Sequence, residues 1–170
     1  MTSAPTTLRV MTVCTGNICR SPMAEVVLRD ALVRAGLADR VRLDSSGTSD
    51  EEHGNPIDSR AQQVLTEAGY EVPRHRARQV TTSDAQQVDV ALAMTAQHAR
   101  RLRQVGFPAE RVVMFRAFEH GVPDGDPSSA SAPDAPDPWY GDMADFRETL
   151  ATVEACVPGV VAYLRARMPQ

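Results

Sequence analysis

Short apolar runs alternate with amphipathic stretches along most of the chain. Four segments are expected to be strands, at 7–13, 41–45, 88–94 and 111–115. The first has few polar residues, as a strand buried on both faces would, and 88–94 is a nearly unbroken apolar run. Between these runs, apolar residues return every three or four positions, as in amphipathic helices, at 21–36, 58–69 and 95–103. The alternation predicts an α/β fold: a single-domain, three-layer α/β/α sandwich around a four-stranded parallel sheet.

Three segments fall outside this alternation. Residues 1–7 are predicted to form a flexible tail, and residues 119–137 are predicted to form a long loop rich in Pro, Ser and Asp. A loop of that length is usually functional or mobile. A last helix is expected from Asp142 onward, and Pro158 is expected to break or kink it. The residues of this helix expected to face inward are Phe146, Leu150, Val153 and Cys156.

The composition is that of a globular protein with one core. A chain of 170 residues suits a single domain spanning 1–170, and 42% apolar with 24% charged residues is ordinary for a soluble protein. The net charge of −4 argues against nucleic-acid partners, and no apolar run approaches the ~20 residues of a membrane span. Because residues 1–7 show no signal-peptide pattern, we expect a cytoplasmic protein, with unconventional export as the alternative. We expect a monomer, with a weak dimer as the alternative.

Cysteine and histidine are too sparse for a disulfide framework or a metal centre. The three cysteines are unevenly placed, and the four histidines are isolated from one another in sequence. We therefore expect no metal and no cofactor. Cys156 is expected in the core, whereas Cys14 and Cys19 share one short loop.

That loop follows the first apolar run and precedes the first helix. Cys14 begins it, Arg20 ends it, and five residues lie between them. Backbone N–H groups at a helix N-terminus favour an anion, and a guanidinium suits two oxygens of one phosphoryl group. Gly16 and Asn17 are residue types that tolerate a positive φ. The loop therefore predicts a phosphate site made by Thr15, Gly16, Asn17, Ile18, Cys19 and Arg20.

Cys14 lies at the floor of this loop, where a thiolate would be stabilised. Such surroundings lower the pKa of a Cys from ~8.5 to ~3.5–7.5 and make it a nucleophile for a bound phosphoryl group. The Ser21 hydroxyl is placed to hydrogen-bond the Cys14 sulfur. The alternatives are that Cys14 is a small buried apolar residue and that Ser21 caps the helix, with Pro22 at its first position.

The run Cys-Thr-Gly-Asn-Ile-Cys-Arg-Ser-Pro at 14–22 resembles the signature of the low-molecular-weight protein tyrosine phosphatases, V-C-x-G-N-x-C-R-S-P. The resemblance implies an enzyme that hydrolyses phosphotyrosine monoesters through a cysteinyl-phosphate on Cys14, with Arg20 binding the phosphoryl group. It implies phosphotyrosine-containing proteins as substrates and inorganic phosphate as product, with no nucleic-acid or membrane partner.

Two further stretches are similar to this family. The stretch 44–54 resembles the family at Asp44, Ser45, Gly47, Ser49, Asp50 and Gly54. Glu51 stands where the family usually has a Trp that walls the substrate cleft; the alternative is a solvated loop charge. Residues 75–79 resemble the family's H-x-A-R-Q. The resemblance implies that His75, Asn17 and Ser45 form a network that supports the phosphate loop, His75 acting through the Asn and Ser side chains.

The run Asp137-Pro-Trp-Tyr-Gly at 137–141 resembles the family's D-P-[YW]-Y-G. A tyrosyl oxygen leaves poorly as an anion, since the phenol pKa is ~10, and a placed acid contributes ~10²–10⁴-fold in rate. Asp137 is the expected general acid and then base, with Asp134 and Asp142 as alternatives. Trp139 and Tyr140 are expected to hold a phosphotyrosine ring. An Asp-Pro turn followed by core aromatics is the competing interpretation.

Cys19 is a candidate redox partner for Cys14. A low-pKa thiolate oxidises readily, and a neighbouring thiol can trap the sulfenic acid as a disulfide. We expect reversible inactivation by peroxide through this pair. The alternative is that Cys19 is a small residue that fills the loop floor.

Three rival functions remain open. Arsenate reductases on the same fold relay oxidation through further mid-chain cysteines, but residues 20–155 contain none. Protein-arginine phosphatases resemble this chain and typically have Thr where Ile18 stands; Ile18 packs against an aromatic ring and favours phosphotyrosine. A phosphate-binding module without activity would be expected to lack Cys14, Arg20 or Asp137, and all three are present.

Overall fold

The structure is a computed structural model that describes residues 6–128 and 131–170. Positions 1–5 of the predicted tail and 129–130 of the predicted long loop lie outside the described residues. The strands are β1 (Leu8–Cys14), β2 (Val41–Gly47), β3 (Val90–Ala93) and β4 (Val112–Met114). The α-helices are α1 (Arg20–Arg34), α2 (Ser59–Glu67), α3 (Thr82–Gln87), α4 (Ala96–Val105) and α5 (Met143–Arg167). Short 3-10 turns are η1 (Ala38–Arg40), η2 (Ala109–Arg111), η3 (Phe115–Phe118) and η4 (Pro138–Tyr140).

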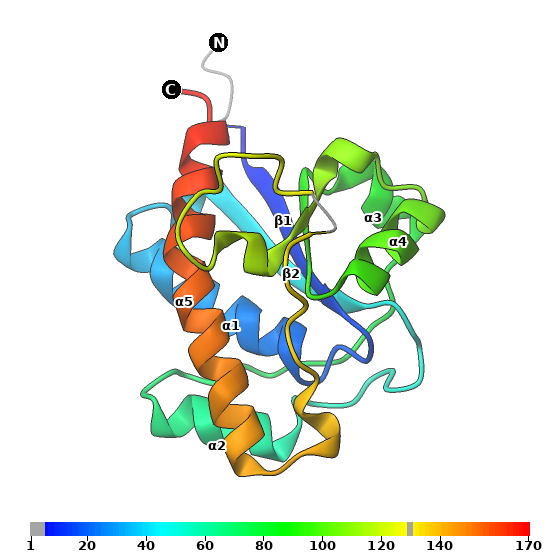
Figure 1. The fold of residues 1–170 in the computed structure, drawn as a ribbon, viewed down its shortest axis with the longest axis vertical. Helices are drawn as coiled ribbons and strands as arrows, with labels where there is room; N and C mark the ends of the chain where they lie inside the picture. The colour runs from blue at the N-terminus through cyan, green and yellow to red at the C-terminus, as the bar shows by residue number, and fades with distance from the viewer. Residues whose placement is uncertain (1–5, 129–130) are drawn as a thin grey trace.

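The four strands form one parallel sheet in the order β2-β1-β3-β4. Helices α1 and α5 pack on one face, and α3 and α4 lie on the other (Figure 1). The predicted three-layer α/β/α sandwich with a four-stranded parallel sheet is therefore confirmed. The chain leaves β1 toward β2 on one side and returns to β3 on the other, so the crevice between the carboxyl ends of β1 and β3 is where such folds bind ligands.

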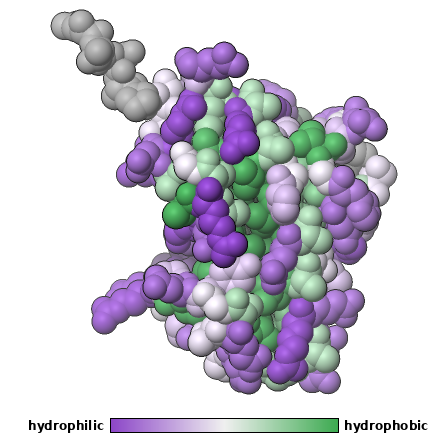
Figure 2. Space-filling model, turned by 90° about the vertical axis from the view of Figure 1, so that its left-hand side faces the viewer, coloured by the Kyte–Doolittle hydropathy of each residue, from purple (hydrophilic) through white to green (hydrophobic). Residues whose placement is uncertain are grey.

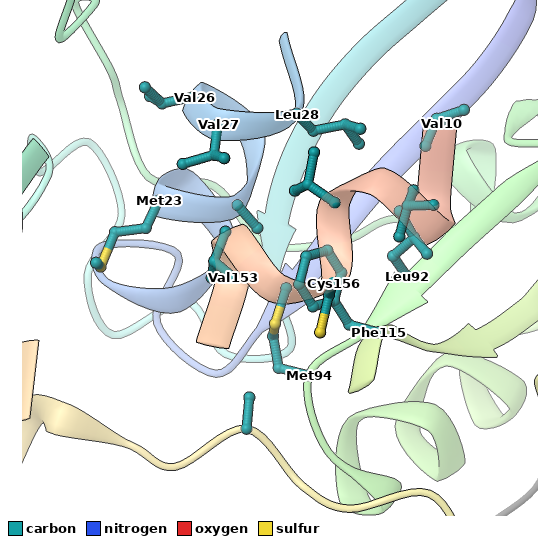
Figure 3. Close-up of a cluster of buried hydrophobic side chains, with 14 of the residues drawn as sticks. Val10, Met23, Val26, Val27, Leu28, Leu92, Met94, Phe115, Val153 and Cys156 are labelled. Carbon is teal, nitrogen blue, oxygen red and sulfur yellow. The ribbon is translucent and has the colours of Figure 1, made fainter. Parts of the chain in front are cut away.

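Side-chain alternation along β1 serves two cores. Val10 packs with α1 and α5, whereas Met11 and Val13 pack with α3 and α4. Figure 3 shows the first core, where Cys156 of α5 lies beside Phe115. Cys156 is fully buried, as expected, and the predicted inward face of α5 is buried along its length.

The structure differs from the sequence prediction in three places. The strands β3 and β4 are shorter than 88–94 and 111–115. Helix α3 was not predicted, because it has only six residues; its start is fixed by a capping box between Thr81 and Asp84. The expected break at Pro158 is wrong: α5 continues through the proline, and the helix packs against α1 and η3.

One face of the molecule is mainly hydrophilic. Figure 2 shows this face, where hydrophobic residues form a narrow band between charged and polar side chains. Across residues 6–128 and 131–170, no helix has both the length and the hydropathy to cross a membrane.

Candidate active site

The phosphate loop lies at the carboxyl end of β1, in the crevice between β1 and β3. It starts at Cys14, the last residue of β1, and ends at Arg20, the first residue of α1. Within the described part of the chain, the backbone N–H groups of residues 15–19 donate to no protein acceptor. Together with the N-terminus of α1, these amides form a cradle suited to the oxygens of a phosphoryl group.

Cys14 is buried at the floor of this cradle. Its Sγ lies 3.0 Å from the Ser21 Oγ, within hydrogen-bonding distance. Ser21 does not cap α1: the helix begins one residue earlier, its N-cap position is Cys19, and no side chain caps it. The Ser21 hydroxyl has two acceptors in reach, the Cys14 sulfur at 3.0 Å and the Ser46 carbonyl at 3.3 Å, so its single proton can go to either.

Asn17 is the centre of the loop's support. It is fully buried and has φ of 59°, a left-handed conformation that Asn tolerates and Gly16 does not adopt. Its Nδ2 donates to Ser21 at 2.9 Å and to Ser45 at 3.0 Å, and its Oδ1 accepts from the Arg78 amide at 3.0 Å. The side chain therefore ties the loop to α1, β2 and the segment after α2.

His75 supports the loop in another way than expected. Its Nε2 lies 2.6 Å from the backbone carbonyl of Asn17, not from the Asn17 or Ser45 side chains. The predicted trio of His75, Asn17 and Ser45 is brought together, but His75 contacts the backbone at the left-handed residue. The contact satisfies a carbonyl that a regular helix or strand would otherwise pair.

Gly47 explains how β2 packs against the loop. A Cβ at this position would lie 2.4 Å from the Thr15 carbonyl oxygen, so only glycine fits there. The following amides, of Thr48 and Ser49, donate to the carbonyls of Cys14 and Thr15 at 2.9 and 3.0 Å. The outer edge of the loop is therefore fixed by backbone hydrogen bonds, while its inner amides stay open.

Arg20 joins the phosphate loop to the segment that carries Asp137. The guanidinium is almost completely buried; its Nη1 donates to the Ala135 carbonyl at 3.0 Å, and its Nη2 lies 3.4 Å from Asp137 Oδ2. The other Asp137 oxygen accepts from the Trp139 amide at 3.1 Å and so caps η4. The Ala135 amide donates to the Met94 carbonyl at the end of β3, which anchors the segment.

A cleft of about 210 Å³ opens above Cys14. The residues predicted to line it do so, and Glu52 joins them; the lining is Cys14, Thr15, Gly16, Ile18, Cys19, Arg20, Glu51, Glu52, Asp137, Trp139 and Tyr140. Tyr140 is 90% exposed, and Trp139 is 40% exposed, so these rings form an outer rim and not part of the core. A buried thiol, a cradle of backbone amides with a guanidinium, and a carboxyl group thus meet under an aromatic rim.

Comparison with known proteins assigns this arrangement to a family. A sequence model of the family described as "Low molecular weight phosphotyrosine protein phosphatase" matches residues 9–169. The chain belongs to this family. Low molecular weight protein-tyrosine phosphatase A of Mycobacterium tuberculosis is 44% identical over 162 residues, which cover 95% of this chain and 94% of the relative. The Streptomyces coelicolor low molecular weight protein-tyrosine-phosphatase is 41% identical over 166 residues, covering 95% and 96%. The crystal structure of YfkJ from Bacillus subtilis is similar with a TM-score of 0.84 at 29% identity, covering 97% and 99%.

The alternative acids of this low molecular weight phosphatase are engaged elsewhere. Asp134 Oδ1 accepts from the Ala96 amide at 2.8 Å, at the start of α4. Asp142 caps α5 through the amides of Ala144 and Asp145. Neither carboxyl group lines the cleft, whereas Asp137 does.

His98 contacts the phosphate loop, and no sequence motif had pointed to it. It is 3% exposed in α4, and its Nε2 lies 2.8 Å from Thr15 Oγ1, while its Nδ1 is buried without a partner among the described residues. Burial, and then the charge of Arg20, lower the pKa of His98 to about 3, so the ring is neutral at neutral pH. A helical period that places His98 with the buried Ala99 and Leu102 on the inner face was the only available signal.

Cys19 is a free, buried thiol close to negative groups. Burial, and then the charge of Asp58, raise the pKa of Cys19 well above its ordinary value. Cys19 is therefore a neutral thiol at neutral pH and does not compete with Cys14 as a nucleophile.

Proposed function

We propose that this phosphatase hydrolyses phosphotyrosine in two steps through Cys14. The Cys14 thiolate attacks phosphorus in line, the bond to the tyrosyl oxygen breaks, and a cysteinyl-phosphate forms. The phosphoryl oxygens are held by the amides of residues 15–19 and by Arg20, whose buried fork cannot lose its charge. The observation that carries the proposal is the set of unpaired loop amides around the buried Cys14 sulfur.

Asp137 acts in both steps. It gives its proton to the leaving tyrosyl oxygen, then takes a proton from the water that attacks the cysteinyl-phosphate, which releases inorganic phosphate and restores the thiolate. The Ser21 hydroxyl donates to the sulfur and stabilises it as a thiolate, both before attack and on release. The position of Asp137 on the cleft wall, next to Arg20, supports this assignment over Asp134 and Asp142.

The cleft rim sets the choice of substrate. Ile18, Trp139 and Tyr140 offer apolar surface to an aromatic ring, which favours phosphotyrosine over phosphoserine. Glu51 and Glu52 add negative charge to the cleft wall, so we expect a preference for basic residues beside the phosphotyrosine. Ile18 in place of a smaller polar residue argues against phosphoarginine.

The test is a panel of phosphotyrosyl, phosphoseryl and phosphoarginyl peptides, with Cys14→Ser as the blank. Phosphotyrosine turnover that is lost in the blank is expected, and it should be faster for peptides with Lys than with Glu beside the phosphotyrosine. Glu51→Gln should reduce that difference. Faster turnover of phosphoarginine would instead favour a protein-arginine phosphatase, and no turnover under reducing conditions would favour a phosphate-binding module.

Redox control belongs to the same proposal. Peroxide converts the Cys14 thiolate to a sulfenic acid, the Cys19 thiol then displaces water to form a disulfide, and a thiol reductant restores both residues. Since the pKa of Cys19 is raised, we expect the disulfide to form slowly. Full recovery of Cys19→Ser by reductant after peroxide would contradict a protective role for Cys19.

The location of the enzyme is a separate part of the proposal. Free cysteines suit a reducing compartment, so we propose that the enzyme acts in the cytoplasm. We propose that it acts there as a monomer.

A further inference from the structure

Arg60, in the first turn of α2, joins the phosphate loop to the segment that carries Asp137. It does not line the cleft. Its side chain is about one-third exposed and reaches three neighbouring groups: Asp58, the backbone of η4 and two aromatic rings. No sequence motif assigned it a role, since an Arg near a helix start is ordinarily a solvated charge.

On one side, Arg60 holds the turn that follows Asp137. Its Nη1 donates to the carbonyls of Trp139 and Gly141 at 3.2 and 3.3 Å, so one nitrogen binds two carbonyls at η4 and its C-cap. The guanidinium carbon lies 5.5 Å from the centre of the Trp139 ring and 4.5 Å from that of Phe146. These distances are in the range of cation–π attraction.

On the other side, Arg60 is fixed to the phosphate loop through Asp58. Its Nε and Nη2 donate to the two Asp58 oxygens, each at 3.1 Å, as a bidentate pair. The Asp58 amide in turn donates to the Ile18 carbonyl at 2.8 Å. Burial raises the pKa of Asp58, but the hydrogen bonds from Arg60 outweigh it, so the carboxyl group has a pKa below its ordinary value and stays ionised.

We propose that Arg60 is a positioning residue: it holds η4, and thereby Asp137, at a fixed place above the phosphate loop. Asp137 is bound to this turn directly, because it caps η4 through the Trp139 amide. The inference rests on the proposed role of Asp137 as the acid. Only a planar fork can donate to Asp58 with one edge, donate to η4 with the remaining nitrogen and stack on Trp139, so Lys cannot replace it.

A purely structural role would be to hold α2 against α5. A second pair serves that role: Arg147 of α5 lies 3.6 Å from Glu67 of α2, and in the described part of the chain no hydrogen bond joins Arg147 to either loop. Arg147→Met is therefore a matched control, since it removes a cation between the same two helices and leaves η4 untouched.

The experiment compares Arg60→Lys, Arg60→Met and Arg147→Met on phosphotyrosine and on an aryl phosphate with a more acidic phenol. For both Arg60 variants we expect kcat/KM for phosphotyrosine to fall about tenfold, a part of the ~10²–10⁴-fold that a placed acid contributes. The fall should be smaller for the activated substrate, which needs less protonation. Arg147→Met should match the wild type on both.

Trp139 is the single tryptophan of the chain, so its fluorescence reports the position of η4 directly. Its emission and its quenching by acrylamide should change in the Arg60 variants and not in Arg147→Met. In the background of Asp137→Asn, Arg60→Lys should have little further effect on phosphotyrosine, because the acid it positions is absent.

Folded Arg60 variants with wild-type Trp139 emission and wild-type dependence on the leaving group would overturn the inference. Should Arg60→Met fail to fold, Arg60→Lys gives the same decision. If Asp137→Asn slows phosphotyrosine and the Arg60 variants do not, only this inference fails. If Asp137→Asn has no effect, the proposed role of Asp137 fails, and the role of Arg60 fails with it.

Discussion

The phosphate loop and the segment from Ala135 to Gly141 meet over the same cleft, yet they are held in different ways. The phosphate loop is built around the fully buried Asn17, which hydrogen-bonds to α1, β2 and the segment after α2. The segment from Ala135 to Gly141, called the acid segment below, is held among the described residues by the side chains of Arg20 and Arg60 and by a backbone hydrogen bond to Met94. The Asp137 side chain is 40% exposed.

The difference separates two parts of the chemistry. The groups proposed to bind the phosphoryl oxygens and attack phosphorus are fixed in advance by a buried network, where an unmade hydrogen bond is costly. Asp137, proposed to handle the proton, lies with the exposed Trp139 and Tyr140 at the surface, and surface segments are the part of a structure that opens most easily. We therefore expect changes in the phosphate loop to affect folding and activity together, and changes in the acid segment to affect activity alone.

The largest effect is expected from Asp137→Asn, which tests the acid segment. The variant keeps the acceptor for the Trp139 amide but cannot donate a carboxyl proton. We expect kcat/KM for phosphotyrosine to fall ~10²–10⁴-fold, with a smaller fall for an aryl phosphate that has a more acidic phenol. The free energy of unfolding should stay within about 0.5 kcal/mol of the wild type, as for most surface changes.

The controls for this variant replace the two alternative acids, as Asp134→Asn and Asp142→Asn. Because Asn keeps the oxygen that each carboxyl group offers to the amides at the start of α4 and α5, both changes should alter the free energy of unfolding by less than about 1 kcal/mol and leave the leaving-group dependence unchanged. If one of them, and not Asp137→Asn, shows that dependence, the acid has been assigned to the wrong residue.

Asn17→Ala tests the phosphate loop and should affect both properties. The change leaves buried donors and acceptors of Ser21, Ser45 and Arg78 without their partner and places Ala at φ of 59°. We expect the free energy of unfolding in urea to fall by about 2–4 kcal/mol, with kcat/KM reduced in the folded fraction. Asn55→Ala, at an exposed position, should leave both values nearly unchanged; similar effects for the two variants would contradict the central place of Asn17.

An effect on stability that is visible only in acid is expected from His98. Its pKa is about 3 in the folded chain and ~6.5 when unfolded, so below pH 6.5 the unfolded chain takes up a proton that the folded chain does not. The contribution of His98 to the unfolding free energy of the wild type should be complete above pH 6.5. It should fall by up to about 1.4 kcal/mol per pH unit from pH 6.5 toward pH 3. His98→Gln should be less sensitive to acid than the wild type over that window. Parallel curves for His98→Gln and the wild type would contradict a buried, neutral His98.

The sequence predicted those features that depend on neighbours along the chain. Residues 14–22 contain the proposed nucleophile, the cradle and Arg20 in one run, and 137–141 contain the proposed acid and the aromatic rim, and the structure brings both runs to one cleft. The alternation of apolar runs was enough for the sheet and its layers, because a parallel sheet buried on both faces needs such runs.

What the sequence did not predict depends on contacts between distant residues. His98 lies 83 positions from Thr15, and Arg60 lies 79 positions from Trp139, so no local pattern joins either pair. Ser21 was a candidate helix cap because a serine followed by a proline is typical of a helix start. In the structure α1 already begins at Arg20, so Ser21 lies inside the helix. His75 lies beside the phosphate loop, as the motif implied, but it contacts the backbone carbonyl of Asn17 and not a side chain. A motif carries no information on which atoms meet.

The most direct test of the account is to trap the phosphorylated enzyme. Asp137→Asn, mixed with an aryl phosphate that has a more acidic phenol and quenched in acid, should accumulate a phosphoryl group, because this substrate needs little protonation in the first step and the base for the second step is missing. We predict that mass spectrometry of the digested protein finds this group on Cys14 and that the adduct is lost in Cys14→Ala. Phosphate release with no adduct on Cys14, or an adduct on another residue, would contradict a cysteinyl-phosphate formed in the phosphate loop.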